Sequence, residues 1–332
     1  MWLAVDGGAT GLRMTIVNSD GTVGGQVRAP GFQWTAQGDP VQQQCDRVVH
    51  AWRELGEPAP VSAVGLGLAG AASDPQSRRR LAPLIARALN AGTVLLTGDD
   101  VTNHLGVLGG EPGVVIAAGT GVACLAVTPG GELLNIDGMG YLFGDRGGGF
   151  AIGQAGLRAA LEAVEGVGAD TALIERAAAV LRAQIETLPR AIRTWYASER
   201  LIARTAEFAI HVTEVAAYDE VARRICQRAG RELAASAAAA ARRAFGGSGA
   251  GNDPDGGDDT GKDTDAGGPG GKVPVSYSGS VLSDRTVFDA FAAALPDQVT
   301  LTEPMGDAMS GAIRLARQPA VPHLSGVIVH RQ

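Results

Sequence analysis

The chain of 332 residues is 45% apolar and 19% charged, the balance of a folded globular protein with room for two domains or one large one. Its net charge of −7 argues against sequence-independent binding to nucleic acid, which requires clustered lysine and arginine side chains. No apolar run is long enough to cross a bilayer, and Asp6 interrupts the first apolar run too early for a signal peptide, so we expect no membrane partner.

The first predicted element is a β-hairpin around Asp6-Gly7-Gly8-Ala9-Thr10. Apolar residues precede the two glycines and recur after them, which is the pattern of two strands joined by a tight turn. Unpaired N–H groups at such a turn form a nest for phosphate oxygens, and Asp6 beside them suits a divalent cation. Taken alone, the motif also fits an ordinary turn, so both interpretations stay open at this point.

Helix and strand signals then alternate as far as residue 112. The expected elements are helices over 45–55 and 77–89 and strands over 61–68 and 93–97. The second of these strands leads directly into Gly98-Asp99-Asp100. Strands that alternate with helices predict a sheet flanked by helices, which we assign to an N-terminal domain, residues 1–112.

A second hairpin is predicted where two strands, 114–118 and 124–127, flank Gly119-Thr120-Gly121. Its layout repeats that of the first hairpin, which indicates two related domains that face each other. We assign residues 113–332 to the second domain. Its further expected elements are a helical region over 154–245, strands at 273–275 and 299–301, a helix at 287–295, and a closing helix over 307–317 that is free to pack on the N-terminal domain.

Residues 246–272 differ in composition from everything around them. Eleven of these 27 residues are glycine, six are aspartate and two are lysine, so the segment contributes 2 − 6 = −4 to the net charge. It has no aromatic or branched aliphatic side chain whose burial could offset the entropy of ordering. We therefore expect a disordered loop within the second domain.

The three cysteines, Cys45, Cys124 and Cys226, are odd in number and far apart. They offer neither a metal-ligand spacing nor a disulfide framework. Buried, inert thiols in a reducing cytoplasm are the expected outcome.

Four glycine-containing turns are each predicted to follow a short apolar strand. They are Gly7-Gly8, Gly119-Thr120-Gly121, Gly144-Asp145 and Gly279. In open α/β sheets, ligands bind beyond the strand ends, where such turns converge. The set of turns therefore predicts a ligand site between the two domains.

These residues carry a resemblance to the sugar kinase, hexokinase and actin superfamily of ATP-binding folds. Within it, the chain resembles the N-acetylglucosamine kinase and BadF/BadG/BcrA/BcrD ATPase group. The matching motifs, in order, are DGGAT at 6–10, VGLGLAG at 64–70, GDD at 98–100, IAAGTG at 116–121, GMGYLFGDRGGGFAIG at 138–153, YSGSV at 277–281 and EPMGDAMSGAIRLA at 303–316. The resemblance implies an α/β protein of two ribonuclease-H-like domains with a nucleotide cleft between them, the second domain carrying the inserted helical region.

The resemblance also implies roles for individual residues around bound ATP and Mg²⁺. The ATP phosphates would be held by Gly7, Gly8 and Thr10 from one domain and by Gly119, Thr120 and Gly121 from the other. Gly279 would leave room for the adenosine, and Asp6 would orient the metal through its waters or through ATP.

On the acceptor side, the resemblance makes Asp99 the general base that takes the proton from a sugar hydroxyl. Asp100 is its competitor, and the pair could also cap the following helix, since aspartate is a favoured N-cap residue. The remaining expected sugar contacts are Gln33, Trp34, Gly70, Gly140 and Asp145. Phosphoryl transfer depends on positioning and charge neutralisation, which fits this mixture of glycine turns and carboxylates.

Several positions depart from the pattern of the group. An asparagine common after the first hairpin is replaced by the stretch containing Gln33 and Trp34, and Trp34 fits either stacking on a sugar or the core. Met139 replaces an aromatic residue, and Arg146 stands where an acidic residue is usual. All these departures fall on the sugar side. His104, close to the expected site, is interpreted as a structural core histidine.

The predicted function is ATP-dependent phosphorylation of an amino sugar, N-acetylglucosamine or glucosamine, a small-molecule substrate. Two alternatives are an ATPase that activates a reductase through an iron–sulfur cluster, and a sugar or nucleotide sensor without catalysis. The three separated cysteines count against the first alternative. Neither the sugar, the hydroxyl that is phosphorylated nor the formation of a homodimer follows from the sequence.

Overall fold

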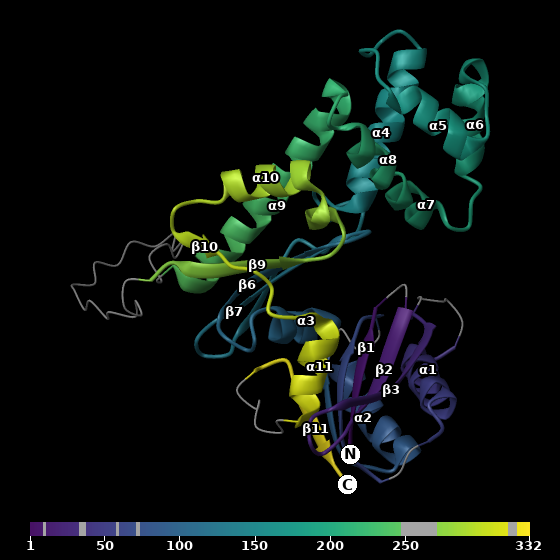
Figure 1. Ribbon diagram of the computed structural model, residues 1–332. Helices are drawn as coiled ribbons and strands as arrows, with labels where there is room; N and C mark the ends of the chain where they lie inside the picture. The colour runs from purple at the N-terminus through teal and green to yellow at the C-terminus, as the bar shows by residue number, and fades with distance from the viewer. Residues whose placement is uncertain (9–10, 33–37, 58–59, 71–73, 247–270, 318–323) are drawn as a thin grey trace, which may run out of the picture.

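The computed structural model describes residues 1–8, 11–32, 38–57, 60–70, 74–246, 271–317 and 324–332. The chain forms two β-sheets with helices packed on both, and the sheets lie one above the other in Figure 1. The first sheet has the strand order β11-β5-β4-β1-β2-β3, and the second has the order β10-β9-β6-β7-β8. Their strands are β1 (Trp2–Gly7), β2 (Gly11–Val17), β3 (Val23–Pro30), β4 (Val61–Leu68), β5 (Ala91–Thr97), β6 (Gly113–Ala118), β7 (Val122–Val127), β8 (Leu133–Ile136), β9 (Val273–Ser278), β10 (Val299–Leu301) and β11 (Ile328–Arg331).

The two sheets share one pairing pattern. In the first, β1, β2 and β3 pair antiparallel, and β1 pairs parallel with β4, which pairs parallel with β5. In the second, β6, β7 and β8 pair antiparallel, and β6 pairs parallel with β9, which pairs parallel with β10. The repeated strand–turn–strand motif of the sequence thus corresponds to the same local topology in both sheets.

Helices cover both faces of the first sheet. Helices α1 (Pro40–Glu54) and α2 (Pro75–Leu89) pack on one face, and α3 (Asp99–Val107) and α11 (Ala308–Arg317) lie on the other. Both α1 and α2 begin earlier than the apolar pattern suggests, because Asp39 and Asp74 cap them and a proline follows each cap.

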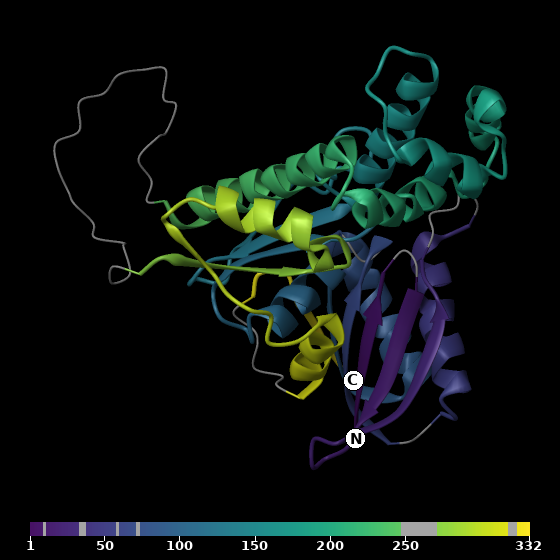
Figure 2. The same ribbon diagram turned by 45° about the horizontal axis from the view of Figure 1, so that its top comes forward.

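The end of the chain returns to the first sheet. Strand β11 pairs antiparallel with β5, and α11 packs against α3, β1 and β4. As a result, the two chain termini lie close together in both Figure 1 and Figure 2. Helix α3 contacts β4 of the first sheet and β6, β7 and β9 of the second, so it lies between the two sheets.

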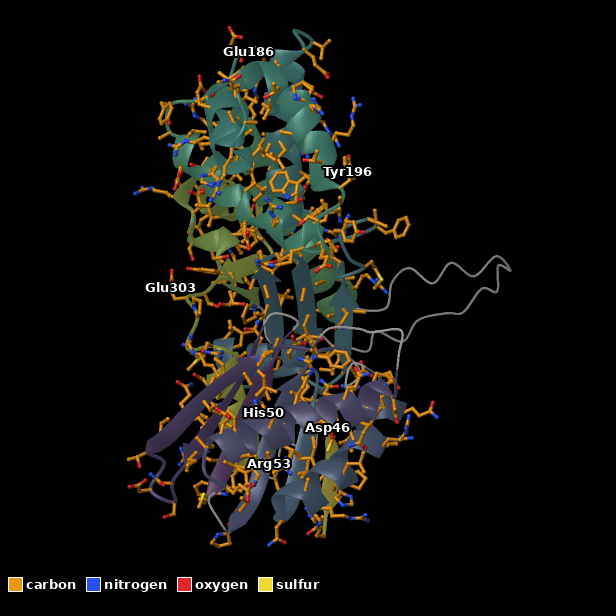
Figure 3. All side chains as sticks on the ribbon, turned by 90° about the vertical axis from the view of Figure 1, so that its right-hand side faces the viewer. Asp46, His50, Arg53, Glu186, Tyr196 and Glu303 are labelled. Atoms are coloured by element: carbon orange, nitrogen blue, oxygen red, sulfur yellow. The ribbon has the colours of Figure 1, made fainter. Side chains whose placement is uncertain are left out.

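The helical region follows β8. It comprises α4 (Gly149–Val164), α5 (Leu173–Leu181), α6 (Leu188–Trp195), α7 (Leu201–Glu207), α8 (Ala209–Val215) and α9 (Glu220–Phe245), with a short 3₁₀ turn at Ile185–Thr187. Its helices α4 to α8 lie on the side of the second sheet that is away from the first sheet. Helices α9 and α10 (Arg285–Ala294) cover the second sheet, after a 3₁₀ turn at Val281–Ser283. Figure 3 shows Glu186 and Tyr196 at the far end from Asp46, His50 and Arg53 of α1.

The helical region begins at Gly149, five residues before its expected start at 154. The expected interruption at 166–168 ends α4, whereas Pro189 lies in the first turn of α6, where a missing N–H costs nothing. Of the Gly/Asp-rich loop predicted over 246–272, residues 247–270 lie outside the described part of the chain.

All three cysteines are buried and unpaired, as predicted. Burial raises the pKa of the Cys45 thiol to about 11 and the pKa values of Cys124 and Cys226 to about 12. Such thiols stay protonated and unreactive near neutral pH. Among the described helices, none combines the length and apolar character needed to pass through a lipid bilayer.

Candidate active site

A cavity of about 590 Å³ lies where the two sheets meet α3. The first hairpin contributes Gly8 and Gly11 to its wall, and the second contributes Ala117 and Ala123, which flank the Gly119-Thr120-Gly121 turn. The other lining residues are Asp6, Leu12, Arg13, Arg28, Ala29, Asp99, Asp100, Asn103 and Ala308. The two glycine hairpins, more than 100 residues apart in sequence, therefore border one cavity.

A second cavity, of about 550 Å³, adjoins the first at α3. The residues that line it are Arg78, Gly98, Asp99, Asp100, Val101, Val122, Ala123, Cys124, Leu133, Asn135, Ile136, Asp137, Gly138 and Met139. Asp99, Asp100 and Ala123 line both cavities. A carboxylate at this position can contact a group held on either side.

Asp99 is the first residue of α3, directly after the capping residue Gly98. Burial raises its pKa to about 7, and the negative charges of Asp100 and Asp6 add to the effect. Its Oδ1 accepts the backbone N–H of Asp100 at 3.1 Å, and Oδ2 faces the first hairpin, since a β-carbon on Gly8 would lie 3.8 Å from it. A carboxyl group with such a pKa can accept and release a proton near neutral pH.

Asp100 differs from Asp99 because both of its oxygens are engaged. Oδ1 accepts the N–H of Val101 at 2.9 Å, and Oδ2 accepts a hydrogen bond from Asn135 Nδ2 at 3.1 Å. Neither aspartate is the N-cap, which is Gly98. Of the two carboxylates, Asp99 is the one with an oxygen directed at the cavity and no side-chain donor among the described residues.

Asp6 is held by an arginine that the sequence analysis did not single out. Arg13, opposite Asp6 in the hairpin register, contacts Asp6 Oδ2 at 2.7 Å through one terminal nitrogen, and its other terminal nitrogen contacts Asp307 at 2.9 Å. Burial raises the pKa of Asp6, and the hydrogen bond from Arg13 opposes this shift. The guanidinium thus joins the start of the chain to the segment that leads into α11.

The two glycine turns use some of their N–H groups internally. The N–H of Gly8 bonds to Gly11 O and that of Gly119 bonds to Gly121 O, each at 2.9 Å, so neither group is free for a ligand. Ala9 and Thr10 lie outside the described residues. The tip of the second turn is open, because Thr120 is exposed and a β-carbon on Gly119 would have no atom within 4 Å.

Gly279 has a structural requirement of its own. Its φ of +92° lies in the left-handed region, and a β-carbon there would collide with the carbonyl of Ala118 in β6. Gly7 is similarly tight, since a β-carbon would lie 2.8 Å from Leu68 Cδ2. The chain itself therefore demands glycine at Gly279, whether or not a ligand is bound, whereas a β-carbon at Gly7 would require only the Leu68 side chain to shift.

The segment from 137 to 150 is organised by Asp137, a residue that the sequence analysis missed. Its carboxylate is 1% exposed, accepts the N–H of Asp145 at 2.6 Å and pairs with Arg146 at 3.0 Å. Asp137 also accepts a hydrogen bond from Ser236 of α9 at 3.2 Å. The available signal in the sequence was the Asp-Gly pair at 137–138, which is typical of a turn, and in the structure Asp137 has a φ of +64°.

One expectation about this segment is wrong. Gly144-Asp145 does not directly follow a strand, because the described residues from 137 to 143 form none; Tyr141, Leu142 and Phe143 form turns and expose 40%, 68% and 88% of their surface. The carbonyl of Gly140 instead accepts the N–H of Gly144 at 2.8 Å, which closes a tight turn. Apolar side chains in a glycine-rich segment mimic a strand signal without a neighbouring strand to pair with.

Asp145 and Gly140 are brought together within this segment. Burial raises the pKa of Asp145, while backbone hydrogen bonds from Val122 and Gly140 lower it. Asp145 also packs tightly on the second hairpin, because a β-carbon on Gly121 would collide with its carboxylate. Asp145 does not itself line the second cavity, whose wall here is Gly138 and Met139.

The remaining predicted sugar contacts divide into two groups. Gln33 and Trp34 lie outside the described residues. Gly70, with φ of +77°, packs on the ring of Phe32, whose backbone N–H bonds to Gly8 O at 3.1 Å. His104 is buried, contacts Gly113 O at 3.1 Å and has its pKa lowered by burial to about 4, which makes it a core residue as interpreted.

The carboxylates of the first cavity fit a metal ion only if a bound ligand, such as a phosphate, supplies further oxygen atoms. Among the described residues, no three His, Cys, Asp or Glu side chains are grouped to hold an ion by themselves. Asp6, Asp99 and Asp100 are the carboxylates that line the first cavity, and Asp6 is already paired with Arg13. Mg²⁺ commonly binds through one or two carboxylates, waters and the phosphates of its substrate, a mode that these residues allow.

Comparisons with known proteins place this geometry among ATP-binding folds. The chain matches the model of the BadF/BadG/BcrA/BcrD ATPase family over residues 3–299. A solved structure of a proposed N-acetylglucosamine kinase from Chromobacterium violaceum is 24% identical, with a TM-score of 0.65 over 95% of this chain and 98% of that one. A second such protein, from Porphyromonas gingivalis, is 18% identical, with a TM-score of 0.66 over 95% and 98%.

A more distant likeness extends to a ROK family glucokinase from Streptomyces griseus in complex with glucose and AMPPNP. It is 16% identical, with a TM-score of 0.54 over 96% of this chain and 99% of that one. These likenesses confirm the predicted α/β fold of two sugar kinase/hexokinase-type domains.

Proposed function

Because the chain belongs to the BadF/BadG/BcrA/BcrD ATPase family, we propose that it transfers the γ-phosphoryl group of ATP to a hydroxyl of an amino sugar, N-acetylglucosamine or glucosamine. The observation that carries the proposal is the position of Asp99. Its carboxylate borders both cavities, it has a pKa of about 7, and it faces the first glycine hairpin. The amino-sugar acceptor follows the proposed activity of the proteins from C. violaceum and P. gingivalis.

In this proposal the first cavity takes the nucleotide phosphates and the second takes the acceptor. Mg²⁺-ATP, when bound, supplies the phosphoryl group and neutralises part of its charge. Thr120, Gly119 and Gly121 would position the phosphates from the second sheet, with Gly7, Gly8 and Thr10 on the opposite side. Gly279 would border the adenosine, and Asp6 would orient waters of the metal while Arg13 holds its carboxylate in place.

Asp99 would take the proton of the attacking hydroxyl as the new O–P bond forms. General-base catalysis of this kind contributes about 10²–10⁴-fold to the rate. Its partly buried position keeps the carboxylate poorly solvated, so its pKa suits proton transfer near neutral pH.

The sugar contacts expected from the sequence are Gln33, Trp34, Gly70, Gly140 and Asp145. Of these, the described residues Gly70, Gly140 and Asp145 do not line the second cavity, so they would contact only a part of the sugar that extends beyond it. Asp137 fixes the backbone around Asp145.

A coupled assay of ADP release tests the proposal. We would compare glucosamine, N-acetylglucosamine, N-acetylmannosamine, glucose and no sugar, with wild-type protein and the Asp99→Asn variant. Sugar-dependent ADP release that falls by at least about 100-fold in Asp99→Asn, with nucleotide binding retained, supports the proposal. An equal rate without sugar would instead indicate an ATPase, and full activity in Asp99→Asn would exclude the general-base role.

The same assay covers the two alternative functions. A reductase activator would hydrolyse ATP without a sugar and contain iron, yet each cysteine here is no more than 4% exposed, which leaves none at a surface to share a cluster. A sensor would bind sugar or nucleotide and release no ADP. No observation of this structure favours either alternative over the kinase.

A further inference from the structure

Arg78 is a buried cation on the wall of the second cavity. It lies in the first turns of α2, one turn after the capping residue Asp74, and is 8% exposed. Its Nε has no hydrogen-bond partner, and its guanidinium forms no ion pair with any described residue. Buried arginine is normally paired, because removing a charge from water is costly.

The two following arginines of α2 show how different Arg78 is. Arg79 is exposed to solvent, and Arg80 pairs with Asp39 at 2.6 Å. Helical periodicity places Arg78 on the same face as Leu81, Ala82 and Ile85, all of which are fully buried. Burial lowers the pKa of Arg78, and the charges of Asp100 and Asp74 offset only part of that effect.

The carboxylates on the wall of this cavity are already engaged. Asp100 accepts hydrogen bonds on both oxygens from Val101 and Asn135. Asp137 is paired with Arg146 and accepts backbone N–H groups of its own segment. Asp99 directs its Oδ2 toward Gly8 of the first hairpin. The carboxylates whose charges act on Arg78 are Asp100 and Asp74, not Asp99. The guanidinium of Arg78 is therefore able to bind an anionic group that enters the cavity.

We propose that Arg78 binds an acidic group of the acceptor, so that the preferred acceptor is a derivative of the amino sugar that bears a carboxylate or a phosphate apart from the hydroxyl that reacts. The planar guanidinium suits both anions, since it can donate two parallel hydrogen bonds to either. The proposal deepens the proposed function, on which it rests for the assignment of the second cavity to the acceptor. Asp99 would then act on the reacting hydroxyl of the acceptor, and Arg78 would bind the acidic group of the same molecule.

Binding measurements test the proposal independently of turnover. Calorimetry in the presence of ADP and Mg²⁺ would compare N-acetylglucosamine with its carboxylated derivative N-acetylmuramic acid and its phosphorylated derivative N-acetylglucosamine 6-phosphate. Inorganic phosphate alone would serve as the probe for a free anion. We expect one acidic sugar to bind roughly 10–100-fold more tightly than the neutral sugar, the gain typical of a charge-assisted hydrogen-bonded contact.

Variants of neighbouring arginines make the test specific. Arg78→Met should bring the ratio of acidic to neutral affinity close to one, Arg78→Lys should restore part of it, and the exposed control Arg79→Met should leave it as in wild type. Equal affinities for acidic and neutral sugars in wild type would overturn the proposal. A ratio of acidic to neutral affinity that Arg78→Met does not change would also overturn it. A loss of affinity confined to ADP would overturn it as well, because it would assign Arg78 to the nucleotide.

The ADP assay separates this proposal from the proposed function. If acidic sugars bind through Arg78 and no sugar, acidic or neutral, yields ADP, the kinase proposal fails and the acidic-ligand site stands. If neutral amino sugars yield ADP as efficiently as acidic ones, the kinase proposal stands and the acidic-ligand site fails.

Discussion

Asn135 of β8 donates a hydrogen bond to Oδ2 of Asp100 in α3, at 3.1 Å. A second bond of this kind runs from Asn103 of α3 to Ser278 of β9, at 3.0 Å. Both join the helix that begins at Asp99 to the second sheet, while the same helix packs on β4 of the first. The proposed base is thus positioned by groups from both domains, and its surroundings depend on how the domains meet.

Burial is the main cause of the raised pKa of Asp99, and the negative charge of Asp100 adds to it, so Asp100 should contribute to the pH at which Asp99 becomes active. Asp100 raises the pKa of Asp99, so Asp100→Asn should lower that pKa and move the acidic limb of the kcat/KM profile to lower pH. The new amide can still accept the hydrogen bond from Asn135. Asn135→Ala is the control, because it removes the bond and keeps both carboxylates. A limb that Asp100→Asn leaves in place would show that Asp99 is not the titrating group.

Asp99→Asn should stabilise the fold while it abolishes turnover. The folded-state pKa of about 7 exceeds the ordinary value of 3.8, so the folded protein binds this proton more tightly than the unfolded chain does. The stability that wild type draws from the protonated group is present below pH 4 and is lost as the pH rises through 7.

The loss amounts to at most about 4 kcal/mol, at ~1.4 kcal/mol per pKa unit. Denaturant melts of both proteins at pH 5 and pH 8 would measure it. The advantage of Asp99→Asn over wild type should be larger at pH 8 than at pH 5. A constant difference would mean that Asp99 titrates normally.

Arg13→Met should destabilise the protein because it leaves Asp6 without its cationic partner. The Asp6 side chain is only 15% exposed, and breaking a buried ion pair by removing one partner costs about 3–5 kcal/mol, so a site at this depth should lose roughly 2–3 kcal/mol. Asp307→Asn breaks the outer bond of the same arginine, where the carboxylate is 55% exposed, and should cost less than ~1 kcal/mol. Urea melts of both variants at neutral pH give the comparison, and equal costs would argue against the inner pair.

Gly279→Ala should destabilise the protein in the absence of nucleotide. The new methyl group would meet the carbonyl of Ala118, and the φ of +92° adds strain. Gly166→Ala is a matched control, since φ is +75° there and no atom lies within 4 Å. The control should lose about 1–2 kcal/mol from backbone strain alone, and Gly279→Ala clearly more. Equal thermal unfolding of the two variants would show that the turn relaxes and that glycine serves only the ligand.

The sequence predicts best those elements whose pattern is local. Strands over 61–68 and 299–301 have the predicted bounds, because both are short apolar runs between turn residues. Strands β3 and β11 escape prediction for different reasons. The side chains of β3 are mostly exposed and two are glycine, and β11 is defined by its partner β5, more than 200 residues away.

The residues of the candidate site likewise fall into those that a local pattern predicts and those that depend on contacts distant in the sequence. The position of Asp99 and Asp100 directly after a strand is predictable from a local signal, and the family resemblance supplies the proposed role of Asp99. The pairing of Arg13 with Asp307 joins residues 294 positions apart, and no local pattern reports it. Arg78 was within reach, because its spacing to Leu81 and Ala82 places it on the buried face of α2, yet three successive arginines resemble an exposed face.

Arg78→Met should raise the stability of the ligand-free protein. The arginine is 8% exposed without an ion pair and its Nε is buried without a hydrogen-bond partner, so the folded state carries a partly desolvated charge that methionine, with a similar stem, would remove. Replacing buried charges by apolar side chains of similar volume is neutral or stabilising by about 1–4 kcal/mol, and we expect a gain of ~1–2 kcal/mol here.

The exposed Arg79→Met should change stability by less than about 0.5 kcal/mol. Thermal melts without ligand, and with the acidic sugar that binds wild type, would show the gain in the first condition and its reversal in the second. A ligand-free Arg78→Met variant less stable than wild type would mean that the protein itself holds this charge. Arg78 would then have a structural role and would not be a binding residue for an anion.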